Sequence, residues 1–306
     1  MLNVEERNRL NGLLKELIPQ INTWRVELSR GQTFIQYETH AGAKHAADLF
    51  GDGIASLFRV ALALMDSIEG SVVTIDEPEL SLHPQAQKTL ASMLARFAKD
   101  RQILITTHSP YLVRWADMSS GAKVYRLTQE AKGVSVGNLR AQTLTSLKQL
   151  VADWQKPNLL DAVSREVFFA DEVVFLEGQE DVGLLKSFSE SRGLPALPAF
   201  GYGAGGFGNI KHFLQMARDL NIPAVAIYDG DHAQEKAEAE RDFPEALIEL
   251  LPTGDIRDKP ARDKNGRELA DIAKVGLFDR HGVLKQEFEE YLTALLARIE
   301  KYFAQH

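Results

Sequence analysis

Asp171-Glu172-Val173-Val174-Phe175-Leu176-Glu177-Gly178-Gln179-Glu180-Asp181 is the stretch of sequence that decides the fold of this chain. Its four consecutive apolar residues, 173–176, are typical of a strand that is buried on both faces of a parallel sheet. The strand pattern stops at Glu177, and a helical pattern begins at Asp181. Open α/β sheets bind their ligands beyond the carboxyl ends of the strands, so both acids are expected to face one site. The competing interpretation is that they only cap a helix or a solvated turn.

A second apolar strand with an acidic ending makes the ligand-binding interpretation stronger. Ala224-Val225-Ala226-Ile227-Tyr228 leads directly into Asp229-Gly230-Asp231. If both strands belong to one sheet, four carboxylates converge at one edge, and cations between them are needed to offset their repulsion. The sequence therefore predicts two divalent ions, Mg²⁺ or Mn²⁺, because these ligands are hard oxygens.

The spacing of these acids resembles that of the Toprim domain of topoisomerases, primases and certain nucleases. The longer run from Arg165 to Asp181 more narrowly resembles the OLD (overcoming lysogenization defect) family of ATPase-nucleases. This resemblance implies an endonuclease that hydrolyses phosphodiesters with two metal ions. The metal ligands and catalytic acids that it implies are Glu177, Asp181, Asp229 and Asp231.

The segment after the second strand departs from the family pattern. OLD-type Toprim domains often carry an Asp-Ile-Glu string, whereas this chain has Asp255-Ile256-Arg257. Asp255 is therefore the nearest candidate for a further metal ligand. A basic cluster over 257–267 is either a solvated loop or a phosphate-contacting one, and its Lys259 could stabilise the leaving charge. The glycine run over 201–208 is either a mobile loop or a nest of N–H groups for a phosphate.

The first half of the chain carries a different set of acids after its strands. The apolar strand 72–75 ends in Asp76-Glu77, and the strand 103–106 leads to His108. Nucleotide hydrolases use such an arrangement, in which the Asp orders Mg²⁺ and the Glu polarises the attacking water. A turn containing Gly51 and Gly53 precedes an apolar helix, and its N–H groups could face a phosphate.

In order and spacing, these residues resemble the signature segment, Walker B motif and switch histidine of ABC-type ATPases, especially the OLD, RecF and SMC group. The ATP-site residues implied are Gly51, Gly53, Asp76, Glu77 and His108. The signature differs, since Phe50-Gly51-Asp52-Gly53 replaces a Ser-Gly-Gly core. A Walker A loop, G-x-x-x-x-G-K-[ST], is absent, and the chain has no Gly-Lys dipeptide. ATP is therefore expected only where an amino-terminal lobe is supplied, by a longer protein or by another chain.

The expected fold class is α/β, with a partial ABC-type ATPase lobe followed by a Rossmann-like Toprim domain with a helical carboxyl terminus. The expected boundaries are 1–135 for the ATPase part, 136–169 for a helical connector and 170–306 for the Toprim domain. A strand at 123–127 is expected at the edge of the first module.

Composition limits which cell compartments and which binding partners fit this chain. The chain has 306 residues, 44% hydrophobic and 25% charged, with a net charge of -8. This charge argues against a broad basic surface that coats nucleic acid, but it allows a local basic cleft. The absence of cysteine excludes disulfides and thiolate chemistry and fits a reducing, cytoplasmic location. No run approaches membrane-spanning length, so no membrane partner is expected.

Three functions remain open from the sequence. The first is the OLD-type nuclease, acting on nucleic acid, with DNA expected; the likeness also implies dimers and a role in defence against phage. The second is a non-cleaving, DNA-associated ATPase or scaffold of RecF or SMC type. The third is another Toprim enzyme, either one acting on RNA or a topoisomerase or primase; a topoisomerase would need a DNA-gate domain for which the chain has no room.

Overall fold

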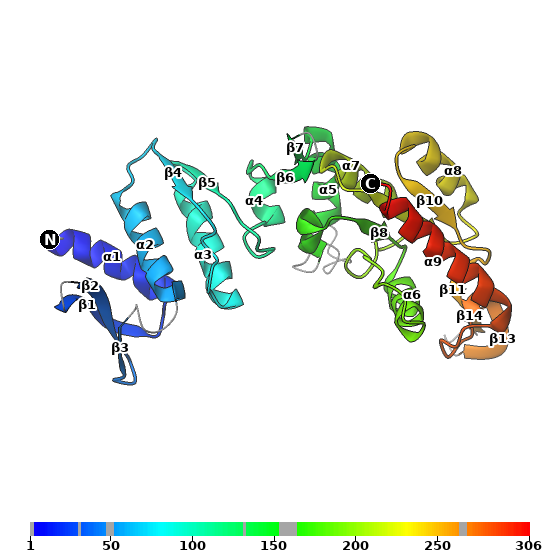
Figure 1. Cartoon of the computed structure of the whole chain (residues 1–306), viewed down its shortest axis with the longest axis horizontal. Helices are drawn as coiled ribbons and strands as arrows, with labels where there is room; N and C mark the ends of the chain where they lie inside the picture. The colour runs from blue at the N-terminus through cyan, green and yellow to red at the C-terminus, as the bar shows by residue number, and fades with distance from the viewer. Residues whose placement is uncertain (1–2, 30–31, 47–51, 131–132, 153–163, 263–267) are drawn as a thin grey trace. The chain divides into compact units, whose positions relative to one another are not determined.

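The computed structural model describes residues 3–29, 32–46, 52–130, 133–152, 164–262 and 268–306 (Figure 1). The chain divides into two compact units, Met1–Arg114 and Trp115–His306. This division lies earlier in the chain than the expected boundary at 135. The segment 123–127 and the described part of the expected connector consequently fall in the second unit.

The first unit has a helical core beside an antiparallel sheet. Leu10, Leu14 and Leu17 of the first helix are buried at helical spacing, and they pack with Phe58 and Leu64 of the second helix. The sheet has the order β1-β2-β3, with Val26 opposite Ile35. The elements are α1 (Val4–Leu17), β1 (Ile21–Ser29), β2 (Gln32–Thr39), β3 (Lys44–Ala46), α2 (Asp52–Asp66) and α3 (Pro84–Phe97).

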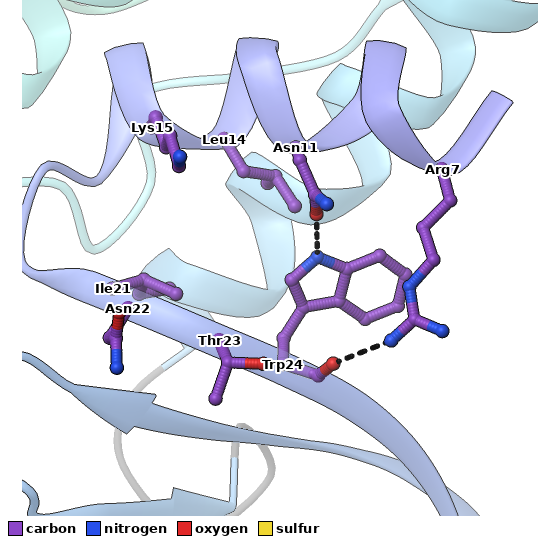
Figure 2. Close-up of a pocket in the computed structure, with 8 residues that line it drawn as sticks. All are labelled: Arg7, Asn11, Leu14, Lys15, Ile21, Asn22, Thr23 and Trp24. Carbon is purple, nitrogen blue, oxygen red and sulfur yellow. Dashed lines mark hydrogen bonds between the residues drawn. The ribbon is translucent and has the colours of Figure 1, made fainter. Parts of the chain in front are cut away.

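A tryptophan joins α1 to β1 at a small hollow of about 110 Å³ (Figure 2). The indole Nε1–H of Trp24 donates to Asn11 Oδ1 at 2.6 Å, and Arg7 donates to the Trp24 carbonyl at 3.3 Å. The indole ring also meets Phe58 edge-on, with 5.5 Å between the centroids. None of the predicted site residues lines this hollow, and its contacts serve to hold the helix on the sheet.

The remaining strands of the first unit are β4 (Val72–Ile75) and β5 (Gln102–Ile105), which pair in parallel. Val72 lies opposite Gln102 and Ile75 opposite Ile105, so the two carboxyl ends lie side by side. The side chains of Val72 and Leu104 are exposed. This pair is therefore covered on one face only among the described residues, whereas parallel sheets are ordinarily buried on both.

The second unit is built on the sheet β10-β9-β8, in which both pairings are parallel. Every residue of β8 and β9 is buried, as the uninterrupted apolar runs predicted. Val225 and Ile227 face the core shared with α6 and α9, while Phe175 on the opposite face stacks on Phe213 of α7. The elements are β8 (Val173–Phe175), α6 (Gln179–Ser191), α7 (Phe207–Asp219), β9 (Ala224–Tyr228), α8 (Ala233–Asp242), β10 (Leu247–Leu250) and α9 (Glu289–Phe303).

The segment before this sheet packs against the carboxyl end of α7. β6 pairs with β7 in an antiparallel hairpin, and Arg126 of β6 donates to the carbonyls of Ala170 and Leu220. The buried Asp219 accepts from the Arg140 backbone at 2.8 Å and the Thr143 hydroxyl at 2.6 Å, at the start of α5. These elements are α4 (Trp115–Ser119), β6 (Tyr125–Glu130), β7 (Gly133–Asn138), α5 (Ala141–Ala152) and the 3₁₀ turn η1 (Ser164–Phe169).

Two short strand pairs lie between β10 and α9. β11 pairs with β14 in parallel, and β12 pairs with β13 in an antiparallel hairpin in which Lys259 is opposite Lys274. Across the described ranges, no helix has the length and apolarity needed to cross a membrane. The elements are β11 (Asp255–Arg257), β12 (Lys259–Arg262), β13 (Glu268–Lys274), β14 (Gly276–Phe278) and the 3₁₀ turn η2 (Gln286–Phe288).

Candidate metal centre

The carboxyl ends of β8 and β9 are joined directly. The parallel register pairs Phe175 with Ala226, so Glu177 and Asp229 follow neighbouring strands at the same edge of the sheet. The backbone N–H of Asp229 donates to Glu177 Oε1 at 2.8 Å. The two acid-tipped strands thus lie in one sheet, as the sequence argument assumed.

Asp181 lies beside this edge on the first turn of α6. Its Oδ2 accepts from the backbone N–H of Gly178 at 2.7 Å, and its side chain is buried. The capping role that the sequence left open is therefore real, but it occupies only one of the two carboxylate oxygens.

The glycine run makes its contacts with the end of β8. Gly203 has a φ of +89°, and a Cβ there would lie 2.7 Å from the backbone carbon of Gly178, so this close approach requires glycine. The N–H groups of Ala204 and Gly206 donate to the carbonyls of Leu176 and Glu177. These two amides are thus used within the chain and are not part of a phosphate nest.

An open cleft of about 310 Å³ lies over this edge. It brings together most of the predicted acids and the predicted lysine, and Asp231 is not among its lining residues. Asp231 lies beside the cleft and forms an ion pair at 2.8 Å with Lys274. The lining residues are Glu177, Gly178, Gln179, Glu180, Asp181, Gly205, Gly206, Asp229, Asp255 and Lys259.

Burial and mutual repulsion make three acids of this cleft unusually weak. Burial, followed by the neighbouring carboxylates, raises the pKa of Glu177, Asp181 and Asp229 to about 7 each. Burial also acts to raise the pKa of Asp231, but the Lys274 ammonium and His232 hold it below its usual range. Nearby lysines offset only part of this effect on the pKa values, and a divalent ion would supply further positive charge.

Cationic side chains border the cleft from β11, β12 and β13. The Lys259 ammonium contacts Glu180 and lies 3.4 Å from Asp255 Oδ1, and Arg257 pairs with Glu180 at 2.7 Å. Lys274 was not predicted from the sequence. It reaches the site because the β12–β13 hairpin places it opposite Lys259, and this pairing is not visible in the spacing of the residues.

The donor chemistry of the cleft fits hard divalent cations. Glu177, Asp181, Asp229 and Asp255 offer carboxylate oxygens, which Mg²⁺ and Mn²⁺ prefer. Among the described residues, however, no three His, Asp or Glu side chains are arranged to hold an ion together as they stand.

The predicted nucleotide residues lie at the ends of β4 and β5. The Thr106 hydroxyl donates to Asp76, and His108 Nε2 lies 3.4 Å from Glu77 Oε1. Glu77 has a φ of +41°, an uncommon backbone conformation for a residue other than glycine. These contacts bring the acid pair and the histidine together.

The predicted glycine turn is described in part. Gly53 lies in the first turn of α2, where a Cβ would come within 2.4 Å of the Ser81 carbonyl oxygen. Gly51 lies outside the described residues. Close packing therefore accounts for the glycine at position 53.

Both units match families of known proteins. Residues 2–114 match the AAA_21 family of AAA domains, and residues 168–231 match the family described as the TOPRIM domain of overcoming-lysogenization-defect-like proteins. These matches confirm the predicted resemblance to the OLD family and the predicted order of the two modules. The mixed α/β fold, with its parallel sheet and carboxyl-terminal helix, is confirmed as well.

The chain is also similar in sequence to individual proteins, over part of their length. The chain is 29% identical over 184 residues to the OLD nuclease of Thermus scotoductus, covering 58% of this chain and 34% of that protein. It is 23% identical over 286 residues to the endonuclease GajA of Bacillus cereus, covering 83% of this chain and 40% of that one. The chain thus spans less than half the length of these relatives. A Smc head domain of Pyrococcus furiosus aligns with a TM-score of 0.37 and 13% identity, covering 48% of this chain and 37% of that one.

Proposed function

We propose that this chain, which resembles the OLD family in both of its modules, provides the metal-dependent site of a nucleic-acid endonuclease. One observation carries the proposal: acids from two adjacent strand ends and the following helix share one open cleft, where burial and mutual repulsion disfavour their charged forms. The nuclease names of the similar proteins support it.

The proposed metal ligands are Glu177, Asp181, Asp229, Asp231 and Asp255, and the proposed ions are two of Mg²⁺ or Mn²⁺. Such ions, when bound, polarise a phosphate and lower the pKa of a water molecule. The chain itself holds Glu177 in place through the Asp229 amide and holds Asp181 through the Gly178 amide. Lys259, which lines the cleft, is placed to stabilise negative charge on a leaving group.

The proposed substrate is DNA. The chain is acidic overall, so affinity for a phosphate backbone has to come from local cations. Arg257, Lys259 and Lys274 supply such cations next to the acids. RNA is the alternative polymer, and comparing cleavage of the two distinguishes them.

The first unit would act as part of an ATPase module. Asp76, Glu77 and His108 lie together at neighbouring strand ends, and Gly51 and Gly53 belong to the proposed signature turn. ATP would bind only with an amino-terminal lobe, supplied by a longer protein or by another chain, because a second copy of this chain would lack the Walker A loop as well. The chain alone is expected not to bind ATP tightly, and micromolar affinity by calorimetry would contradict this. A cytoplasmic location and a role in defence against phage are further proposals from the OLD likeness.

A non-cleaving, DNA-associated ATPase or scaffold is the second candidate. The observation that favours it is the arrangement of the acids, since no three described side chains are poised around an ion. A decayed nuclease site would bind neither Mg²⁺ nor Mn²⁺ and would leave DNA intact.

Cleavage of a supercoiled plasmid tests the two candidates. The protein is incubated with plasmid in Mg²⁺ or Mn²⁺, with and without ATP, and with chelator as a blank. The nuclease proposal expects nicked or linear product in the presence of metal only. An RNA of matched length, run in parallel, tests the choice of polymer. Intact plasmid and intact RNA in both metals, with DNA bound in a mobility-shift assay, would favour the scaffold.

A further inference from the structure

His232 is held in place by an aromatic ring from another element. It precedes the first residue of α8, directly after Asp231, and its side chain is only 19% exposed. Phe207, the first residue of α7, stacks on its imidazole with 3.8 Å between the centroids and 24° between the planes. No pattern in the sequence links Phe207 to His232, because the two residues are distant in the chain.

The imidazole faces two of the proposed metal ligands. His232 Nε2 lies 3.6 Å from Glu177 Oε2 and 3.4 Å from Asp231 Oδ1, and its Nδ1 lies 3.8 Å from Glu235 Oε2. The other oxygen of Glu177 accepts from the Asp229 amide. Glu177 therefore has a neighbour at each oxygen: a backbone N–H donates to one, and an imidazole lies near the other.

A donor in this position has a specific physical effect. Glu177 and Asp231 come from different strand ends and repel each other, and Nε2 of His232 lies between them at 3.6 and 3.4 Å, so that a small side-chain rotation would let its N–H donate to either acid. His232 does not line the cleft, so it acts from behind the acids. Partners that hydrogen-bond ligating carboxylates fix their orientation, and losing one typically costs about 10- to 100-fold in metal affinity or activity.

We propose that His232, with its ring fixed by Phe207, is a positioning residue that orients Glu177 and Asp231 for divalent-ion binding. This inference rests on the proposed function, because it assumes that these acids bind metal. The alternative is that the ring pair only packs α7 against α8. Two substitutions separate these roles, since one keeps the donor and the other keeps the bulk.

The test is Mn²⁺ binding to the full chain, measured by electron paramagnetic resonance. His232→Leu retains apolar bulk against Phe207 but has no donor, while His232→Gln places an amide N–H near the former Nε2. His232→Leu is expected to weaken Mn²⁺ binding by about tenfold or more, and His232→Gln to restore most of the affinity. His281→Ala, an exposed histidine of the same unit that does not line the cleft, is the matched control and should bind as wild type does.

Thermal melting in chelator shows whether each variant is folded. If His232→Leu does not fold, Phe207→Leu carries the test, because it releases the ring and should weaken Mn²⁺ binding in the same direction by a smaller factor. Wild-type affinity in folded His232→Leu would overturn the proposal. So would a His232→Gln protein as weak as His232→Leu, since shape alone would then matter.

Plasmid cleavage by the same proteins separates this inference from the proposed function. Weaker Mn²⁺ binding by His232→Leu, without cleavage by any protein, would support the positioning role and refute the nuclease. Cleavage by wild type with unchanged Mn²⁺ binding and cleavage in His232→Leu would do the reverse. A wild-type protein that binds no Mn²⁺ would overturn both.

Discussion

The strand ends β4–β5 and β8–β9 show what burial does to the same local pattern. Both are parallel strand pairs with acids beyond a strand end. In the first pair only β4 is followed by acids, whereas in the second pair both strands are. In the first unit, Asp76 is exposed and accepts from a threonine hydroxyl, and His108 is 83% exposed. In the second unit, helices cover both faces of the sheet, and Glu177 and Asp229 are withdrawn from water. Acids in such surroundings need a cation, whereas exposed acids are stabilised by solvent.

Removing one buried acid charge is expected to have the largest effect. Asp229→Asn keeps the volume but removes a charge and a good ligand, so metal-dependent cleavage should fall by at least about 100-fold. Glu177→Gln should behave alike. Cleavage is measured together with thermal melting, and Glu240→Gln on α8, outside the cleft, is the control. Variants that cut as wild type does would reduce these acids to helix and turn caps.

Truncation tests how much of the chain the second unit needs for its stability. Asp219 is buried and accepts from Arg140 and Thr143, which a fragment 164–306 lacks and a fragment 115–306 retains. Without these two donors the Asp219 carboxylate keeps the Gln215 amide as a hydrogen-bond donor, so the shorter fragment should be less stable by about 1–3 kcal/mol. Urea unfolding of both measures the difference. Equal midpoints and slopes would show that β6, β7 and α5 are dispensable for the second unit.

The lysines next to the buried acids should matter less than the acids. Lys259 and Lys274 are each paired with a carboxylate but are a third to a half exposed, which weakens their interactions. Lys259→Met and Lys274→Met should each lower the cleavage rate by about tenfold, the loss of one charged hydrogen bond. Lys236→Met on α8 serves as the control. If only one lysine matters, it is the one that contacts the reacting phosphate.

The last expected effect is on the dependence of folding stability on pH. The folded-state pKa values of Glu177, Asp181 and Asp229 are raised to about 7, above their usual values near 4. Between about pH 4 and about pH 7 the folded protein therefore binds more protons than the unfolded protein does. Metal-free protein should therefore melt at a lower temperature as pH rises from about 4 to about 7. Mg²⁺ or Mn²⁺ should offset the loss at pH 8.

Two asparagine variants sharpen this comparison of the units. Asp229→Asn should raise the melting temperature of the metal-free protein at pH 8, because it removes a buried charge. Asp76→Asn should leave it unchanged, because Asp76 is exposed. A melting temperature that is flat with pH for metal-free wild type would mean that the acids are solvated in solution.

Local patterns were sufficient to predict the strands and the acids that follow them. The runs 173–176 and 224–228 are apolar throughout and short, which is typical of strands buried on both faces. Glu177 and Asp229 could be assigned to one edge because parallel strands share a direction. The strand at 123–127 was expected to join the first unit, but β6 lies in the second unit, where it pairs with β7 and its Arg126 donates to the Ala170 carbonyl.

The sequence by itself determined the two-module order, the acid-tipped strands and the absence of a Walker A loop, because these depend on residues close together in the chain. Only the tertiary structure placed Lys274 next to Asp231 and His232 under Phe207. It also decided which acids are buried, and so which of them have a raised pKa. Such contacts depend on hairpin pairing and helix packing between distant segments, and neither leaves a periodic mark in the sequence.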